Sequence, residues 1–334
     1  MIVIIFSIPY FVLKVVGPDF YRYFINITYT FAIIGLIFYG LSLISPAFYN
    51  FTGKIAPALH TDPTQLPVGF PLGREKTILA FDKGFILYTF RLNIGPILRS
   101  AGPFWEPGAY AAFLVIALIF NIASTKSLLE KKSLVFIVAL ITTYSTSGYL
   151  SLFVIFLSYL LWGNEGKMTD LKFLLLPIVF VGVWYSYAHL PFLGDKISSL
   201  YDREMAYSLS SDTEGRFLST ERALYTIGQH PFFGRGLVKE TAAAYGSQEA
   251  LAYGIPAMMV RLGLIGFIMI YVGWYYGLKK ILMVEGYNNK FAWTSLLAIS
   301  IVLFSESLYF APIYLMIFYF PFVHGDPADD DEAG

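Results

Sequence analysis

Residues 99–111 read RSAGPFWEPGAYA and lead directly into an apolar run, residues 109–122. The stretch places an arginine, Arg99, and a carboxylate, Glu106, at the mouth of a predicted membrane helix that starts at Pro107. An ionisable side chain is costly to hold close to lipid, so such a residue usually has a function. Arg99 and Glu106 are therefore the first candidate site residues, and a helix anchor at the membrane surface is the alternative role for Arg99.

The composition of the whole chain is that of a membrane protein. Of the 334 residues, 57% are hydrophobic, 18% are aromatic and only 14% are charged, whereas soluble domains carry about 25% charged residues. The 23 basic and 23 acidic residues cancel, so a nucleic-acid partner has no electrostatic support. The chain has no cysteine, which excludes disulfides, a thiolate nucleophile and a cysteine-held metal.

The apolar segments predict nine membrane spans, because a hydrocarbon core of ~30 Å needs about 20 helical residues. These spans are residues 1–16, 26–45, 104–123, 134–144, 149–162, 171–187, 254–277, 291–304 and 308–323. The first has no small-residue cleavage site, so we interpret it as a membrane helix and not as a removed signal peptide. The fourth and fifth are short, and they form either a hairpin that turns at Thr146-Ser147-Gly148 or one broken helix.

The predicted fold class is therefore all-α, a polytopic transmembrane helix bundle of about nine spans. A single integral-membrane domain covers residues 1–323. An acidic, disordered tail follows at residues 324–334, where three consecutive aspartates are more typical of a solvated end than of a metal site.

Basic residues indicate which side of the membrane each short loop faces, since Lys and Arg accumulate on the cytoplasmic side. One set of alternate loops holds Lys14, Arg22, Lys126, Lys131, Lys132, Lys167, Lys172, Lys279, Lys280 and Lys290. With these loops in the cytoplasm, the amino terminus lies outside and the carboxyl tail inside. The two long loops, residues 46–103 and 189–253, then face outward, and only they are large enough to build a site outside the membrane.

The second long loop contains a predicted amphipathic helix, residues 214–229, that lies on the membrane or on the bundle. Its apolar positions at helical spacing are Phe217, Leu218, Leu224 and Ile227. Arg216 and Arg222 lie on or beside the polar side of this helix. They are either ligands of an anion or part of a solvated helix face.

His230-Pro231 is predicted to end this helix, since proline cannot continue it. The turn Gly234-Arg235-Gly236 follows and could bring backbone amides and a guanidinium to an anion, although such a turn alone is a weak signal. Arg261 is predicted eight residues into the span 254–277. A charge at that depth should face the bundle interior or a water-filled cavity.

Five segments of the chain carry a resemblance to a known family. They read RSAGPFWEPGAYAAF from residue 99, TTYSTSGYLSLFVIFL from residue 142, GRFLSTERALYTIGQHPFFGRGL from residue 215, RLGLIGFIMIYV from residue 261 and SESLYFAP from residue 305. In this order and spacing, over residues 95–320, the chain resembles the superfamily of O-antigen polymerases and O-antigen ligases, which are bacterial envelope glycosyltransferases. Members often have an arginine where this chain has Gly148, and they usually have more than nine spans.

The resemblance implies glycosyl transfer from an undecaprenyl-pyrophosphate-linked oligosaccharide to a second sugar acceptor, on the outer face of the cytoplasmic membrane. It implies no metal, nucleotide or other cofactor. Arginines in a partly dehydrated pocket can bind the departing pyrophosphate bidentately and stabilise its charge. Arg99 and Arg216 are the main catalytic candidates on this basis. The supporting arginines are Arg222, Arg235 and Arg261.

The acceptor hydroxyl needs a base or an orienting carboxylate. Glu106 is the first candidate, but it precedes Pro107 at a helix start, where the helix dipole lowers its proton affinity, so it could instead cap the helix or pair with Arg99. Glu306, flanked by two serines, is the second catalytic candidate. Glu249 and His230 are further alternatives, although a histidine before proline more often only ends a helix.

Three function classes follow: a polymerase of lipid-linked repeat units, a ligase that moves the finished glycan to another acceptor, and a lipid-linked sugar transporter or flippase. Ligases of this superfamily resemble one another in a histidine shortly before the next span, where this chain has Ser247-Gln248-Glu249, which favours the polymerase. Two long outer loops and the absence of an internal repeat argue against the transporter. The expected partners are the lipid-linked donor and acceptor and membrane lipid, and a chain-length regulator is left open.

Overall fold

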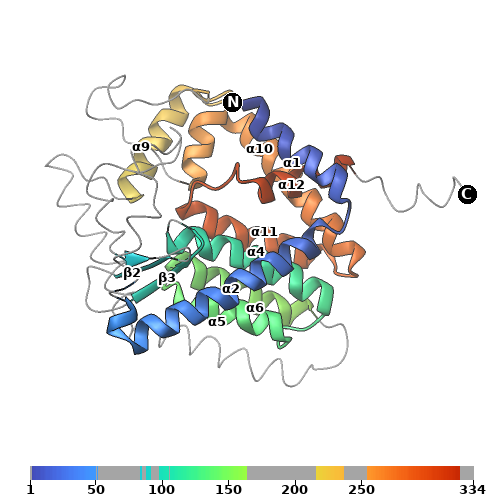
Figure 1. Ribbon diagram of the computed structural model, residues 1–334. Coiled ribbons are helices and arrows are strands. Elements are labelled where there is room, and N and C mark those ends of the chain that lie inside the picture. The colour runs from blue at the N-terminus through green and yellow to red at the C-terminus, as the bar shows by residue number, and fades with distance from the viewer. Residues whose placement is uncertain are drawn as a thin grey trace, which may run out of the picture.

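The computed structural model describes most of the predicted bundle. The described residues are 2–49, 51, 83–84, 88–91, 98–104, 106–163, 216–236 and 254–323. Their elements are α1 (Ile2–Val16), α2 (Phe20–Ile44), β1 (Lys83–Gly84), β2 (Tyr88–Arg91), β3 (Leu98–Gly102), α4 (Pro107–Thr125), α5 (Lys131–Thr142), α6 (Thr146–Trp162), α9 (Arg216–Gln229), α10 (Gly254–Val284), α11 (Asn289–Ser305) and α12 (Pro312–Val323). Figure 1 shows these helices stacked side by side.

The all-α membrane fold is confirmed. Among the described helices, α2, α4 and α10 are long and apolar enough to cross a membrane, and α1, α6, α11 and α12 contribute shorter apolar helices. Eight of the nine predicted spans coincide with helices of the structure. The remaining one, residues 171–187, and the acidic tail lie outside the described residues.

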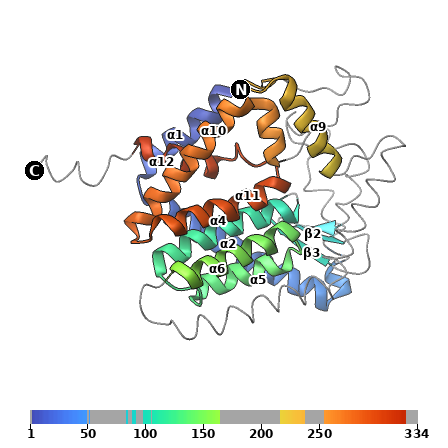
Figure 2. The same cartoon turned by 180° about the vertical axis from the view of Figure 1, so that it is seen from behind.

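Helix α4 is the centre of the bundle. It contacts α2, α5, α6 and α11, and strand β3 lies against its start (Figures 1 and 2). In the most apolar 18-residue stretch of α4, 83% of the residues are buried. This burial explains why the sequence of α4 is hydrophobic on all sides of the helix and not along one stripe.

The fourth and fifth predicted spans are two separate helices, as in the hairpin alternative. Helix α5 ends at Thr142 and α6 begins at Thr146, so the connection is Thr143–Ser145 and lies slightly earlier than predicted. The side chain of Ser145 accepts a hydrogen bond from the Gly148 amide and caps α6. The predicted turn residues Thr146-Ser147-Gly148 are instead the first turn of α6, because this serine cap starts the helix before them.

Two features of the fold differ from the expectation. The first long loop contains a three-stranded antiparallel sheet in the order β1-β2-β3, in which Arg99 pairs with Phe90. The predicted span 254–277 is also not one continuous helix, since α10 has a non-helical residue, Gly263, at φ 67° and ψ −178°. This backbone conformation is open to glycine and strained for other residues.

Three turns that carry basic residues meet at one end of the bundle, which we call the basic end. Tyr21 donates a hydrogen bond of 2.5 Å to Glu285, so the α1–α2 and α10–α11 turns lie together. The Lys126 ammonium group lies 4.0 Å from the centre of the Tyr287 ring and brings in the α4–α5 turn. Three of the four predicted basic loops therefore lie together, and the fourth, which holds Lys167 and Lys172, lies outside the described residues.

Candidate functional site

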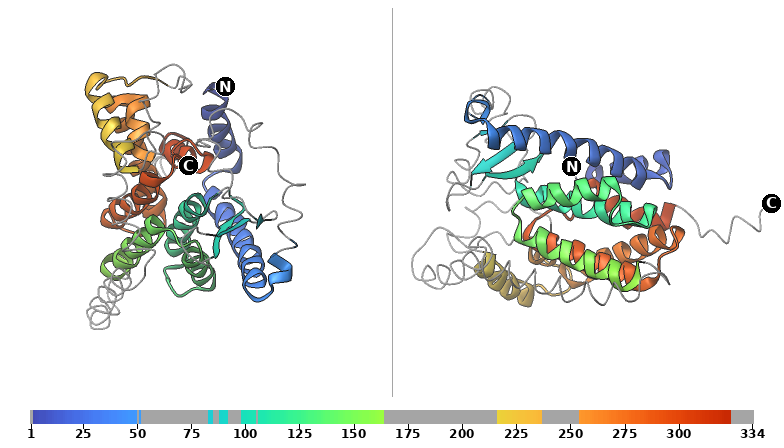
Figure 3. Two further views of the ribbon diagram at one scale, coloured as in Figure 1. Left: turned by 90° about the vertical axis from the view of Figure 1, so that its left-hand side faces the viewer. Right: turned by 90° about the horizontal axis from the view of Figure 1, so that it is seen from below.

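The candidate site lies at the opposite end of the bundle, which we call the site end. Strand β3, the start of α4, the α5–α6 turn and the end of α11 meet there. Figure 3 shows the strands at this end of the stacked helices. Three of the segments quoted for the family resemblance, which are distant in the sequence, thus become neighbours in space.

Arg99 is held at the site end by the backbone of the α5–α6 turn. Its side-chain Nε donates a hydrogen bond of 2.9 Å to the carbonyl oxygen of Thr143, and the residue is half-buried. At the preceding residue of β3, the hydroxyl of Tyr39 in α2 donates to the carbonyl oxygen of Leu98 at 2.9 Å. The α5–α6 turn therefore holds the guanidinium, and α2 holds the backbone of its strand.

Glu106 stands directly before α4, as predicted, with extended backbone (φ −151°, ψ 154°) and Pro107 in the first helical position. Its carbonyl oxygen accepts a hydrogen bond from the Tyr110 amide at 3.2 Å. Its carboxylate makes no capping hydrogen bond to the first turn. The structure therefore does not show the Glu106 side chain capping α4.

Glu306 is the buried carboxylate of the site end, with only 5% of its surface exposed. It follows the last residue of α11, and its side chain rests on the backbone of Gly108 in the first turn of α4. A Cβ atom added to Gly108 would lie only 2.7 Å from the carboxylate carbon Cδ of Glu306. The helix amides at that end carry partial positive charge, which stabilises a carboxylate placed there. Glu106 and Glu306 therefore flank the same helix turn.

A chain of serine hydroxyls joins the α5–α6 turn to the end of α11. The Ser147 hydroxyl lies 3.2 Å from that of Ser145 and 2.9 Å from that of Ser305. The next serine along, Ser307, accepts a hydrogen bond of 2.9 Å from the Gly254 amide at the start of α10. The Ser-Glu-Ser segment around Glu306 is thus fastened to two other helices.

Gly148 is a contact point between two helices. A Cβ atom at this position would lie 3.0 Å from the Cβ of Ala111 in α4. The position is buried, so α6 approaches α4 closely because no side chain separates them. An arginine here would require a different spacing of the two helices.

Arg261 lies just before the break in α10, where its Nη1 donates a hydrogen bond of 2.8 Å to the hydroxyl of Tyr309. Tyr309 is buried and belongs to the segment that follows Glu306. Arg261 lies in α10 at the predicted position, and the helix is interrupted two residues later, at Gly263. The guanidinium still reaches inward, as predicted for a charge at this position.

The turn Gly234-Arg235-Gly236 is docked on this break. The Arg235 amide donates to the Val260 carbonyl oxygen at 2.8 Å, and the Gly236 amide donates to that of Arg261 at 2.9 Å. Gly234 and Gly263 approach so closely that a Cβ on Gly234 would lie 2.5 Å from the Gly263 nitrogen. These amides therefore fasten the turn to α10. The side chain of Arg235 donates to Gln229 at 3.1 Å.

The predicted amphipathic helix is present as α9, which begins at Arg216. Its buried face is Ala223 and Ile227, which pack on Val260 of α10. Leu224, expected on the apolar stripe, is 61% exposed, because α10 covers only the side of the helix next to it. His230 ends the helix and is exposed. The side chains of Arg216 and Arg222, and all of Glu249, lie outside the described residues.

The structure therefore brings Arg99, Glu106 and Glu306 to one end of the bundle and links Arg261 to them through the segment after Glu306. Sequence reasoning missed Gly108 and the hydroxyls of Ser145, Ser147 and Ser305. Gly108 could have been noticed in the sequence as the glycine of the Glu-Pro-Gly segment. Within the described ranges, no three His, Asp or Glu side chains are grouped as metal ligands.

A buried carboxylate, a fixed arginine and a hydroxyl-rich turn thus lie together at one end of the apolar helix bundle of a membrane protein. Residues 132–255 match the family model described as O-antigen ligase. The matched part is therefore similar to the O-antigen ligase family, and this similarity supports the resemblance seen in the sequence and a membrane glycan-processing enzyme. No curated protein and no solved structure matches the chain.

The matched range covers α5, α6 and α9 and ends at the start of α10. It includes the hydroxyl-rich turn and the segment that docks on Gly263. The Glu-Pro-Gly and Ser-Glu-Ser segments lie outside it, and they join the matched part through the contacts of Arg99 with Thr143 and of Ser305 with Ser147.

Proposed function

We propose that this enzyme polymerises undecaprenyl-pyrophosphate-linked oligosaccharide repeat units of O-antigen or a related surface polysaccharide. The proposed place is the outer face of the bacterial cytoplasmic membrane. The observation that supports this most is the meeting of Arg99, Glu106 and Glu306 at the end of the bundle opposite to the basic turns. Since basic turns favour the cytoplasmic side, the site end faces the outer substrate pool.

The residues at the site end suit the chemistry of this transfer. The bond between the sugar anomeric carbon and the pyrophosphate oxygen breaks, and a glycosidic bond forms to the acceptor hydroxyl. The hydroxyl proton passes to a carboxylate, and undecaprenyl pyrophosphate leaves. Guanidinium groups can stabilise the charge that develops on the pyrophosphate, so the proposed reaction needs no metal ion.

Two carboxylates are available for the acceptor hydroxyl. Glu106 is half-buried, and an incoming sugar can reach it more easily than Glu306. Glu306 is enclosed and rests on α4, which favours a role in holding the start of that helix and its neighbouring groups in place. We therefore propose Glu106 as the residue that contacts the acceptor, with Glu306 as the alternative base.

The second candidate function is that of a ligase, because the matched family model carries that description. A ligase transfers the finished glycan to a different acceptor, such as the lipid A core. The segment Ser247-Gln248-Glu249 stands where ligases of the superfamily resemble one another in a histidine, and this supports the polymerase.

The test is a reconstitution in liposomes with purified protein and lipid-linked repeat units as the only glycan. A polymerase makes a ladder of longer lipid-linked products and releases undecaprenyl pyrophosphate in proportion. A product that forms only after a second kind of acceptor is added would contradict the polymerase and indicate the ligase. Movement of intact repeat units across the bilayer without new bonds would indicate a flippase.

A further inference from the structure

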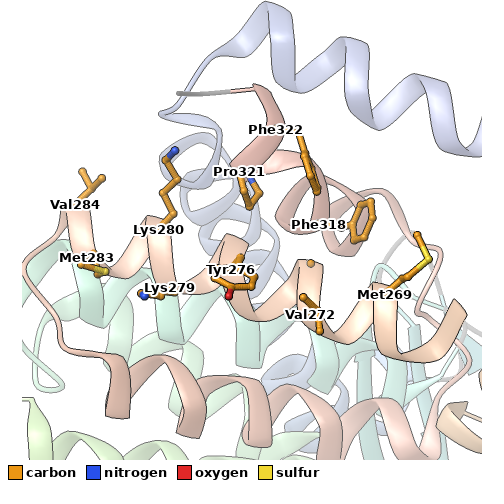
Figure 4. A pocket seen from close by; sticks show the side chains of 11 residues that line it. Met269, Val272, Tyr276, Lys279, Lys280, Met283, Val284, Phe318, Pro321 and Phe322 are labelled. Carbon is orange, nitrogen blue, oxygen red and sulfur yellow. The ribbon is translucent and has the colours of Figure 1, made fainter. Parts of the chain in front are cut away.

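A groove of about 800 Å³ runs between α10 and α12 on the outside of the bundle, away from the candidate site. Figure 4 shows the side chains that line it. Its apolar lining includes Met269, Val272 and Tyr276 of α10 and Phe318, Pro321 and Phe322 of α12. Two lysines, Lys279 and Lys280, belong to the same lining.

Two glycines of α10 bring the two helices close together beneath the groove. A Cβ on Gly273 would lie 3.2 Å from the Phe318 ring carbon Cγ, and one on Gly277 would lie 2.8 Å from the carbonyl carbon of Ile317. Close helix approach at small residues is typical of packing inside membranes. The Phe318 ring takes the space that a side chain at Gly273 would fill, so the buried Gly273 forms the floor of the groove where α10 and α12 meet.

The apolar walls of the groove are open to the surroundings of the bundle. Met269 is 61% exposed, Tyr276 is 53% exposed and Phe322 is 72% exposed. In a membrane, these side chains face hydrocarbon chains. A hollow between ridges favours one chain lying along it, since it gains contacts on three sides.

The two lysines indicate where the headgroup of a bound lipid would lie in the membrane and that this headgroup would be anionic. A rise of about 1.5 Å per residue puts Lys280 about 16 Å from Met269 along α10, which is close to half of the ~30 Å hydrocarbon core. The same rise puts Lys280 about 24 Å from Leu264, the first residue after the break at Gly263, so the lysines lie far from the site end. The lysines therefore lie at the membrane surface of the basic end, and the apolar part of the groove spans one leaflet.

We propose that this groove is a binding site for one anionic phospholipid of the leaflet at the basic end. An acyl chain lies along Met269, Val272 and Phe318, and the phosphate of the headgroup binds at Lys279 and Lys280. Lysine near a membrane surface extends its ammonium group to lipid phosphates in this way. The proposal does not depend on the enzyme's reaction. The polyprenyl substrate fits it poorly, because its pyrophosphate is required at the other end of the bundle.

The experiment is native mass spectrometry of the purified protein with phosphatidylglycerol and phosphatidylcholine of equal chain length, offered together. We expect retained phosphatidylglycerol to exceed phosphatidylcholine by the order of tenfold, since each lysine adds attraction for an anionic headgroup. The double variant Lys279→Gln and Lys280→Gln should lose this preference. The matched control, Lys131→Gln with Lys132→Gln, changes a lysine pair of the same end that lies off the groove and should keep it.

A second variant separates the groove from the charge. Val272 is 47% exposed, so Val272→Trp should fill the groove without disturbing the core, and it should reduce the retention of both lipids. Equal retention of the two lipids by the unaltered protein, or an equal loss of preference in both lysine double variants, would overturn the proposal. So would displacement of phosphatidylglycerol by undecaprenyl phosphate at equimolar amounts, because the groove would then belong to the polyprenyl carrier.

Discussion

Replacing Gly108 by alanine adds one methyl group at the contact between α4 and the Glu306 side chain. The new Cβ would collide with the carboxylate oxygen Oε1 of Glu306 and would lie 2.7 Å from its carboxylate carbon. Carbon atoms pack at about 3.5–4.0 Å. The carboxylate must therefore retreat by about 1 Å, while every ionisable group of the site remains in the chain.

The expected effects on stability and on activity differ in size. Over-packing costs ~1–3 kcal/mol, and alanine in place of a helical glycine returns ~0.5–1 kcal/mol. The variant should therefore stay folded, with a small loss of thermal stability. A catalytic constellation displaced by about 1 Å loses on the order of 100-fold in rate, so polymer formation should fall far more than stability.

The assay is the initial rate of ladder formation in the reconstituted liposomes, with the melting temperature of the same purified sample. Gly40→Ala is the matched control, since Gly40 lies in α2 and a Cβ there meets nothing within 4 Å. It should leave polymer formation unchanged and raise the melting temperature slightly, because alanine replaces a helical glycine without a new collision. Glu306→Asp, added to Gly108→Ala, shortens the side chain by one methylene and should restore the lost thermal stability.

Two results would refute this reasoning. Unaltered polymer formation by Gly108→Ala would mean that the position of the Glu306 carboxylate does not matter to the reaction. A loss of stability that Glu306→Asp fails to relieve would mean that the methyl group collides with something else.

Three further predictions concern the membrane topology, the hydrogen-bonding geometry of Arg99 and the identity of the catalytic base. Reporter fusions at Thr64 should read as outside and fusions at Asn288 as inside, and the opposite result for Thr64 would place the site on the wrong face for the proposed substrate. Arg99→Ala should lower polymer formation by ~10²–10³-fold, and Arg99→Lys should stay impaired because an ammonium cannot make two parallel hydrogen bonds; normal polymer from either would reduce Arg99 to an anchor. Glu106→Gln should lose nearly all activity at normal abundance, whereas an active Glu106→Gln beside an inactive Glu306→Gln would move the base to Glu306.

Most of the helices could be predicted from the sequence because lipid imposes a simple rule on it. A span must be apolar over its length. The starts of α4 and α6 are also marked in the sequence, by Pro107 in the first helical position and by the capping residue Ser145. The small sheet was missed because its strands are short and follow a loop. In the sequence, only the apolar residues beside Arg91 and Arg99 distinguish these strands from the rest of the predicted loop.

The packing of the site end could not be predicted, because it depends on contacts between distant segments. The Glu-Pro-Gly segment indicates a helix start, but nothing near Gly108 indicates that Glu306 rests on it. The break at Gly263 is hidden for the same reason. Its neighbours are apolar, and the backbone hydrogen bonds that compensate the break come from residues 231–236.

The docking of Gly234 on Gly263 has a consequence for how such enzymes can diverge. Gly236 is tied to Arg261, and Gly254 is tied to Ser307, so the segment between them is anchored at both of its ends. Doubling the length of a closed loop costs only ~0.6 kcal/mol. A change in chain length between Gly236 and Gly254 that keeps Ser247-Gln248-Glu249 should therefore leave α9 and Arg261 in place.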